Sequence, residues 1–258
     1  MYCSVTQLMK FYDSGLGVLV RDMLQQHISQ IWPDVHGYRI LGCGYAVPYM
    51  EHFLTQNPER VIAMMPKKQG VRYWPAENKN LSFFCSEDSF PIETASIDRV
   101  LLVHHLEGCD DLRASVREIW RVLKADGKAL IIAPNRTGVW THGERTPFGH
   151  GRPFTMMQLQ DLLCCNLFEQ SHYTRGLFVP PVFDLSFVMR LAPVIERLGG
   201  SLLPFACGVH ILEVRKRVFA GVDKTGGGSA VLAKTKAILG GKGVIVPQGY
   251  IPPTMNSR

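Results

Sequence analysis

The sequence predicts a doubly wound α/β fold, in which helices cover both faces of a mostly parallel sheet. Three observations predict it. Short apolar runs alternate with helical segments along the chain, the first run leads into a Gly-Cys-Gly turn at residues 42–44, and hydrophobic residues make up 46% of the 258 residues against 19% charged ones. Strands that alternate with helices form parallel sheets with crossover helices. The composition also supports a sizeable buried core and excludes global disorder.

Seven short, mostly apolar runs are the predicted strands. They lie at residues 38–41, 61–65, 81–85, 97–105, 128–134, 168–180 and 208–219. The glycine turn follows the first run, and Pro66 stops the second. Asp126 and Gly127 form the turn that leads into the fifth.

Helical segments connect most of these strands. The predicted helices cover residues 16–31, 47–54, 111–123, 154–168 and 185–200. In the first helix, apolar side chains recur at helical spacing, and Pro33 ends it. Thr155 is the expected N-cap of the fourth. Residues 66–80 hold two prolines and a glycine, so an irregular connection is expected there instead of a helix.

The chain divides into three parts. Residues 1–35 form an N-terminal helical segment, residues 36–220 the α/β domain, and residues 221–258 a flexible, basic, glycine-rich tail. The tail holds eight of the 24 glycines and five basic residues against Asp223 alone, so it carries most of the formal net charge of +6. The basicity therefore describes the tail and not the folded part.

Cysteine usage and hydropathy indicate the compartment. The seven cysteines are odd in number and form no Cys-x-x-Cys pair, so neither a disulfide framework nor a zinc site is expected. Adjacent Cys164 and Cys165 on a predicted helix are expected to be core thiols. The N-terminus lacks the basic and apolar regions of a secretory signal, and no run of 18 apolar residues predicts a membrane span. These features predict a cytoplasmic protein.

The segment at residues 90–136 carries a recognisable pattern, formed by Pro91, Asp98, Glu118, Arg121, Val122, Leu123, Lys124 and Gly127. With the Gly-Cys-Gly at residues 42–44 as the core of a first motif, this pattern resembles the type 11 branch of the class I S-adenosylmethionine-dependent methyltransferases. The resemblance covers residues 36–219. It implies a Rossmann-like seven-stranded sheet with an antiparallel last strand, S-adenosylmethionine as the cofactor, and methyl transfer to a small or mid-sized acceptor.

The resemblance also implies which residues lie at the cofactor. These are Gly42, Cys43, Gly44 and Tyr45 at the first turn, Met64 and Met65 at the end of the second strand, Ser86, Glu87 and Asp88 after the third, and His104 after the fourth. In that family, an acidic residue after the second strand commonly holds the ribose hydroxyls. Here Ile40 and the Met64-Met65 pair occupy positions where acidic residues are expected, and Ser86 replaces an aspartate. The two methionines are either an apolar adenosine wall or core residues at the end of a strand.

Two further groups are candidates for the acceptor side. His105 is the candidate general base, because alternation along the fourth strand turns one of His104 and His105 toward the crevice; a structural histidine is the alternative. The loop 135–154 carries His142, Arg145, His150 and Arg152 beside aromatic residues. Its arginines either clamp a carboxylate or phosphate of the substrate or belong to a solvated loop. No metal site is expected, because the histidines lack ligand spacing.

The leading interpretation is a methyltransferase that acts on a small molecule. The alternative is a methyltransferase-like, non-catalytic binding or regulatory protein that has lost S-adenosylmethionine binding, which the departures at Ile40, Met64 and Met65 favour. A third interpretation, an RNA methyltransferase, rests on the basic tail and the arginine-rich loop. The near-neutral folded part argues against a nucleic-acid partner. No membrane partner is expected, and the sequence leaves the oligomeric state open.

Overall fold

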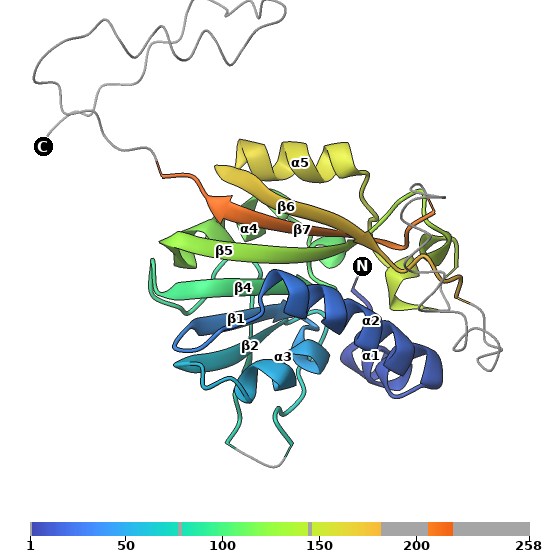
Figure 1. The fold of residues 1–258 in the computed structure, drawn as a ribbon, viewed down its shortest axis with the longest axis horizontal. Coiled ribbons are helices and arrows are strands. Elements are labelled where there is room, and N and C mark those ends of the chain that lie inside the picture. Colours follow the sequence, from blue (N-terminus) through green and yellow to red (C-terminus); the bar gives the residue numbers. More distant parts are fainter. Residues whose placement is uncertain (1, 77–78, 144–145, 182–205, 219–258) are drawn as a thin grey trace, which may run out of the picture. The chain divides into compact units, whose positions relative to one another are not determined.

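The computed structural model describes residues 2–76, 79–143, 146–181 and 206–218. These residues form a seven-stranded sheet with helices on both faces (Figure 1). The strands are β1 (Arg39–Gly44), β2 (Arg60–Pro66), β3 (Ser82–Cys85), β4 (Ile97–Val103), β5 (Leu123–Pro134), β6 (Phe168–Gly176) and β7 (Val209–Lys216). The helices are α1 (Val5–Tyr12), α2 (Gly15–Ile31), α3 (Val47–Leu54), α4 (Leu112–Val122) and α5 (Met156–Cys165), with short 3₁₀ turns η1 (Leu106–Gly108), η2 (Val139–Thr141) and η3 (Pro147–Gly149).

The strand order is β3-β2-β1-β4-β5-β7-β6. The first five strands in the chain are mutually parallel, and β7 runs antiparallel to both β5 and β6. The predicted doubly wound sheet with an antiparallel last strand is therefore confirmed. The predicted helix at 185–200 and the tail at 221–258 lie outside the described residues, and the three-part division of the chain stays a prediction.

Consecutive residues of the central strands are buried in two separate cores, one on each face of the sheet. On β4, Leu101 packs with α2 and α3 on one face of the sheet, and Leu102 packs with α4 and α5 on the other. Both side chains are buried. A parallel sheet that is covered on both faces has this pattern of continuous apolar strands. Since the helices of residues 1–35 contribute to the first core, that segment packs directly on the sheet.

Helix α1 was not expected from the sequence. It begins with a capping box, in which the hydroxyl of Ser4 accepts from the backbone N–H of Gln7 and the side chain of Gln7 accepts from the N–H of Ser4. Ser4 followed by Gln7 is the sequence signature of such a start. The helix has only eight residues, and its apolar face is short. It buries Leu8 and Tyr12, and these two residues bring it to the functional end of the sheet.

Three further expectations need correction. Asp126 and Gly127 lie within β5, which starts at Leu123 without a separate turn. Cys164 and Cys165 are exposed, so the expectation of core thiols is wrong; they lie on the outer side of α5. The loop 135–154 is not a solvated excursion, because Trp140 and Phe148 are buried in the first core. In the part of the chain that the structure describes, no helix is both long and apolar enough to span a membrane.

Candidate functional site

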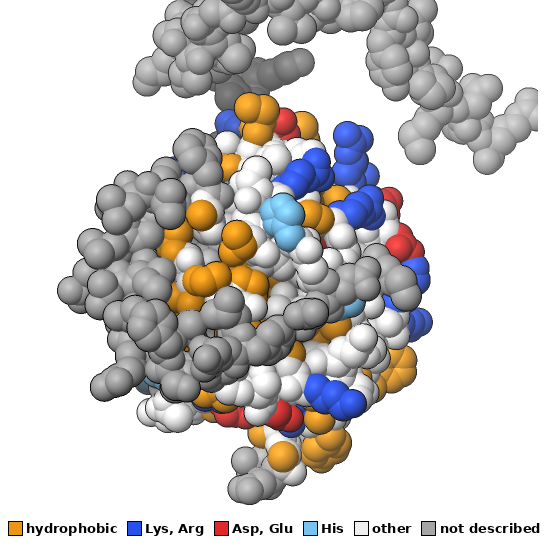
Figure 2. Space-filling model, turned by 90° about the vertical axis from the view of Figure 1, so that its right-hand side faces the viewer, with side chains coloured by type: hydrophobic (Ala, Val, Ile, Leu, Met, Phe, Trp, Pro, Cys, Tyr) orange, Lys and Arg blue, Asp and Glu red, His pale blue; other side chains and the backbone are white. Residues whose placement is uncertain are grey.

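The strand order reverses beside β1 and places a crevice at the carboxyl ends of β1 and β4. From β1 the chain moves outward to β2 and β3, then returns to the other side of β1 as β4. Ligands of open α/β sheets bind outside the carboxyl ends of the strands at such a switch point. Figure 2 looks onto this end of the molecule, where several hydrophobic side chains lie together near the middle of the visible face and Lys and Arg side chains lie toward its rim.

The glycines of the first turn are required by packing against β4 and α3. Gly44 has φ +79°, and a Cβ atom there would lie 2.3 Å from the carbonyl oxygen of Val103. The next residue, Tyr45, donates its backbone N–H to that same carbonyl at 2.7 Å. A Cβ on Gly42 would lie 2.1 Å from Sδ of Met50 on α3. Both glycines therefore hold the floor of the crevice close to its neighbours.

Aromatic side chains from the chain itself fill the crevice. Tyr12 of α1 lies with its ring centroid 5.6 Å from that of Tyr45 and 5.9 Å from the ring of His104. Its hydroxyl is hydrogen-bonded to the hydroxyl of Tyr49 at 3.0 Å and to Nε2 of His104 at 2.9 Å. Phe148 covers the other side of the His104 ring, at a centroid distance of 4.7 Å. All five side chains are buried, and burial raises the pKa of Tyr12 well above its usual value, so it remains a neutral phenol.

His104 is the histidine that faces the crevice. It has a left-handed φ of 51°, which turns its side chain out of the alternation of β4. Its Nδ1 lies 3.1 Å from Oε1 of Glu107 on η1, and its Nε2 bonds Tyr12. An imidazole that is oriented by a carboxylate through one nitrogen presents the other nitrogen for proton transfer.

His105, the candidate base, points away from the crevice. It is 1% exposed, and its Nε2 is hydrogen-bonded to Oγ of Ser115 on α4 at 2.9 Å. Burial lowers the pKa of His105 to about 4, so the ring is neutral near pH 7. His104 and His105 therefore point in different directions at the carboxyl end of β4.

The space left in the crevice is a cavity of about 10 Å³. Its lining residues are Tyr2, Cys3, Leu8, Gln69, His104, Glu107, Gly108, Pro147 and His150. Tyr2 packs on the backbone of Gly108, where an added Cβ would lie 2.2 Å from the tyrosine ring. The backbone N–H of Val5 donates to the carbonyl of Gln69 at 2.8 Å. The first residues of the chain therefore cover the crevice from both the β2 and the β4 sides.

Two buried polar groups at this cavity have no hydrogen-bond partner within the described residues. Both amide atoms of Gln69 are unpaired, although the residue is only 2% exposed. Oε2 of Glu107 is also unpaired, while Oε1 bonds His104. Buried polar groups are nearly always paired, and an unpaired group costs about 1–3 kcal/mol. Three of the seven unpaired buried side-chain atoms among the described residues therefore lie at this one cavity.

The other predicted cofactor residues lie around the crevice with different surroundings. Cys43 and Met64 are buried in the core on the α4 side, and Met65 is buried in the opposite core. The Met65 sulfur accepts from the backbone N–H of Arg72, and Nη1 of the Arg72 side chain donates to the Tyr45 hydroxyl at 3.2 Å. Ser86 is half-buried and Asp88 exposed. Glu87 is buried, and its Oε1 accepts from the backbone N–H of Asp110 at 3.3 Å.

The basic loop forms hydrogen bonds to backbone carbonyls, two of which belong to the segment after β4. Arg152 donates from Nη2 to the carbonyl of Cys109 at 2.5 Å, and its backbone N–H donates to the carbonyl of Glu107 at 2.8 Å. Nδ1 of His142 donates to the carbonyl of Gly138 at 2.8 Å. His150 lines the cavity, and Arg145 lies outside the described residues. Arg152 therefore already serves to hold the segment after β4 in place.

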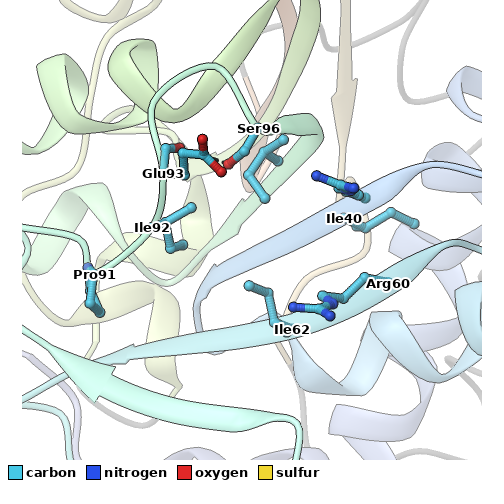
Figure 3. A pocket seen from close by; sticks show the side chains of 9 residues that line it. Ile40, Arg60, Ile62, Pro91, Ile92, Glu93 and Ser96 are labelled. Atoms are coloured by element: carbon cyan, nitrogen blue, oxygen red, sulfur yellow. Dashed lines mark hydrogen bonds between the residues drawn. The ribbon is translucent and has the colours of Figure 1, made fainter.

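A larger pocket, of about 280 Å³, lies at the opposite end of the sheet. Arg39, Arg60 and Ile97, the first residues of their strands, line it, and Figure 3 shows Ile62 and Ile92 facing the space with Glu93 and Arg60 on opposite sides. Arg39 is already paired, because its Nε donates to Glu59 Oε1 at 2.6 Å. Since this is the amino end of the strands, it is not where the fold concentrates ligand-binding loops. We place the site in the smaller crevice because the unpaired atoms of Gln69 and Glu107 lie there.

Sequence comparison finds a similarity over residues 40–131. A family model described as "Methyltransferase domain" matches residues 40–131. YrhH of Bacillus subtilis (strain 168), whose name assigns it provisionally to the methyltransferases, is 32% identical over 78 residues. That match spans 28% of this chain and 43% of YrhH, so the chain corresponds to less than half of that relative's length.

Solved structures of S-adenosylmethionine-dependent methyltransferases share the fold. One from Thermotoga maritima has a TM-score of 0.56 at 16% identity, with 83% of this chain and 96% of that one covered. One from Archaeoglobus fulgidus has a TM-score of 0.55 at 16% identity, with coverage of 80% and 96%. One from Mesorhizobium loti has a TM-score of 0.54 at 13% identity, with coverage of 74% and 96%. At this low identity the likeness concerns the architecture.

Proposed function

We propose that this chain is a class I methyltransferase, which binds S-adenosylmethionine in the crevice at the carboxyl ends of β1 and β4 and methylates a small or mid-sized acceptor. The match of residues 40–131 to a methyltransferase-domain model and the fold shared with S-adenosylmethionine-dependent methyltransferases support the proposal. The observation that carries the proposal is that this crevice, within the matched residues 40–131, collects the unpaired polar atoms of Gln69 and Glu107.

The polar groups fit such a cofactor, and the space fits it only after a rearrangement. S-adenosylmethionine carries an ammonium group, a carboxylate and ribose hydroxyls, and the unpaired carboxylate and carboxamide can serve some of these. A cavity of about 10 Å³ admits at most a water molecule. The proposal therefore requires that residues 2–12, with Tyr2 and Tyr12, leave the crevice when the cofactor enters.

The bound cofactor supplies an activated methyl group on a sulfonium, so the protein's main task is to hold the acceptor in line with it. Departure of Tyr12 frees Nε2 of His104, while Glu107 continues to hold Nδ1. His104 is then the base that takes the proton of a hydroxyl or amine acceptor at Nε2. This assigns to His104 the role that the sequence suggested for His105.

Titration calorimetry with S-adenosylmethionine and S-adenosylhomocysteine tests the proposal. Saturable heat with either ligand supports cofactor binding, and the absence of heat at millimolar ligand would contradict it. His104→Gln should then retain S-adenosylhomocysteine binding while methyl transfer falls by about 100-fold or more, in the range typical of general-base removal. His105→Gln is the matched control and should leave transfer nearly unchanged in the folded protein.

One observation favours the non-catalytic alternative, namely that the chain's own aromatic side chains fill the crevice. If the closed form is permanent, then neither the full chain nor variants that loosen α1 will bind the cofactor. The calorimetric experiment on such variants separates the two functions.

A further inference from the structure

We infer that the pocket of about 280 Å³ at the amino ends of the strands is a second binding site, which takes a small zwitterion with its carboxylate and its ammonium at opposite ends of an apolar chain. This pocket shares no lining residue with the crevice that contains His104 and Glu107. The inference therefore does not depend on the proposed function.

The floor of the pocket is apolar. Ile62 of β2 and Ile92 of the loop before β4 are half-buried at the margin of the second core, and Figure 3 shows both side chains facing the space. The described residues between β2 and β3 include no helix that could cover Ile62. An alkyl chain that lies on these side chains removes apolar surface from water, which favours binding.

The wall of the pocket is held in place by α4. Nη1 and Nη2 of Arg121 donate to the carbonyl oxygens of Ile92 and Phe90, each at 2.9 Å. Glu118 accepts from the backbone N–H of Phe90 at 2.8 Å. Because these bonds fix the loop 90–96 without a ligand, binding requires little further ordering of the chain.

Several charged groups around the pocket are already paired. Nε of Arg39 donates to Glu59 at 2.6 Å, and Nζ of Lys124 donates to Asp98 at 2.7 Å. These pairs neutralise one another and offer no net charge to a ligand.

Arg60 and Glu93 differ from these groups, because their exposed side chains form no hydrogen bond or ion pair with the residues that the structure describes. Figure 3 shows them on opposite sides of the space between Ile62 and Ile92. Arg60 is also the direct neighbour of Arg39 across β1 and β2, and two adjacent guanidinium groups repel each other. A carboxylate at Arg60 and an ammonium at Glu93 complement both charges.

The separation of the two charges selects the ligand. An α-amino acid carries its charges on neighbouring atoms, so it cannot serve both sides of the pocket at once. The volume of about 280 Å³ lies close to the lower limit of about 300 Å³ for small-molecule pockets. ε-Aminocaproate, a short alkyl chain with one charge at each end, has the required pattern and is the probe.

A titration of the full chain with ε-aminocaproate, followed by NMR of the isoleucine methyl groups, tests the inference. We expect saturable shifts at Ile62 and Ile92 and none at Ile211, which is buried in the first core. Caproate lacks the ammonium and hexylamine lacks the carboxylate. Each should bind about 5-fold more weakly than ε-aminocaproate, the loss expected for a partly exposed ion pair.

Two variants assign the charges. Glu93→Gln should remove the advantage of ε-aminocaproate over caproate, and Arg60→Gln should remove its advantage over hexylamine. Both side chains are exposed, so both variants should keep the thermal midpoint of the native chain. Arg117→Gln is the matched control on the exposed side of α4 and should leave all three affinities unchanged.

The absence of saturable shifts at Ile62 and Ile92 would overturn the inference. Equal affinities for the three probes would also overturn it, because they would show an apolar contact without charge recognition. Binding of S-adenosylhomocysteine is a separate readout, which Arg60→Gln and Glu93→Gln should leave unchanged. If the native chain binds ε-aminocaproate and not S-adenosylhomocysteine, the proposed function falls and this inference stands.

Discussion

The hydroxyl of Tyr12 and Nε2 of His104 form a hydrogen bond of 2.9 Å between residues that are 92 positions apart in the chain. This bond ties α1 to the end of β4 and occupies the nitrogen that would otherwise face a substrate. The Tyr12 hydroxyl also bonds Tyr49, so one side chain joins α1, α3 and the loop after β4. Tyr12 is therefore the residue through which α1 contacts the carboxyl end of β4.

Tyr12→Phe should loosen the cover without changing its shape. The ring remains, but the buried Nε2 of His104 and the Tyr49 hydroxyl lose their partner, which costs about 1–3 kcal/mol in the closed state. Urea unfolding should show this loss. Because only the closed form is penalised, S-adenosylhomocysteine should bind about 5-fold tighter or more in calorimetry.

Tyr173→Phe is the matched control for that change. The Tyr173 hydroxyl also bonds a histidine, Nδ1 of His210 at 3.1 Å, but it does so on β6 and β7. It should lower stability and leave ligand affinity unchanged. Equal affinities in native protein and Tyr12→Phe would show that α1 does not compete with the ligand.

Gly108→Ala should expel Tyr2 from the crevice. The new Cβ would lie 2.2 Å from the ring of Tyr2, and a contact that short forces one of the two groups to move. Limited proteolysis should then cut the chain more rapidly within its first twelve residues. The double variant Tyr2→Ala with Gly108→Ala should recover part of the stability that Gly108→Ala loses, since the clash is gone.

Gly143→Ala is the neutral counterpart, because a Cβ there would meet nothing within 4 Å. If Tyr2→Ala does not restore stability to Gly108→Ala, the contact between Tyr2 and Gly108 does not hold the N-terminal segment in the crevice.

Two buried histidines make stability depend on acidity. Burial is the largest cause that lowers the pKa of both His105 and His210, in each to about 4. Above the ordinary histidine pKa of about 6.5 both the folded and the unfolded chain are neutral at these positions, so stability there is unaffected. Between about pH 6.5 and 4 only the unfolded chain takes up the protons, and stability falls by up to about 1.4 kcal/mol per pH unit for each histidine.

His210→Gln should therefore flatten the fall in the free energy of unfolding between pH 6.5 and 4, measured by urea denaturation at several pH values. The slope should decrease even if the variant is less stable at pH 7. An unchanged slope would mean that His210 is protonated equally in both states.

The basic tail should be dispensable for folding. The last strand that the structure describes, β7, ends at Lys216, and the tail residues from 221 onward hold too few apolar side chains to form a core of their own. A chain that ends at Ala220 should keep its thermal midpoint within a few degrees of the full chain. A large drop in calorimetry would show that the tail packs on the domain.

The fold could be predicted because it depends on local patterns. Leu101 and Leu102 lie in an apolar run that is buried on both faces, and the predicted glycines end β1, where Gly44 approaches Val103 closely. The arrangement of side chains in the crevice was harder to predict, because its contacts join residues that are far apart in the sequence. Nothing near Tyr12 in the sequence indicates His104 as its partner.

The choice between His104 and His105 shows a second limit. Alternation along a strand assigns neighbours to opposite faces, but the positive φ of His104 ends that alternation at the point where the choice is made. Gln69 and Glu107 were not predicted as site residues, because what distinguishes them is that they carry buried polar atoms without hydrogen-bond partners. An unpaired buried group is a property of the folded chain and leaves no pattern in the sequence.

We propose that the cofactor and residues 2–12 compete for one crevice, and amide hydrogen exchange of α1 can test this claim. The exchange rates of Leu8 to Tyr12 are measured in the full chain with and without saturating S-adenosylhomocysteine, with α5 as the internal reference. We predict that the ligand accelerates exchange in α1 and leaves α5 unchanged. Saturable ligand binding with the protection of α1 unchanged or increased would contradict the claim.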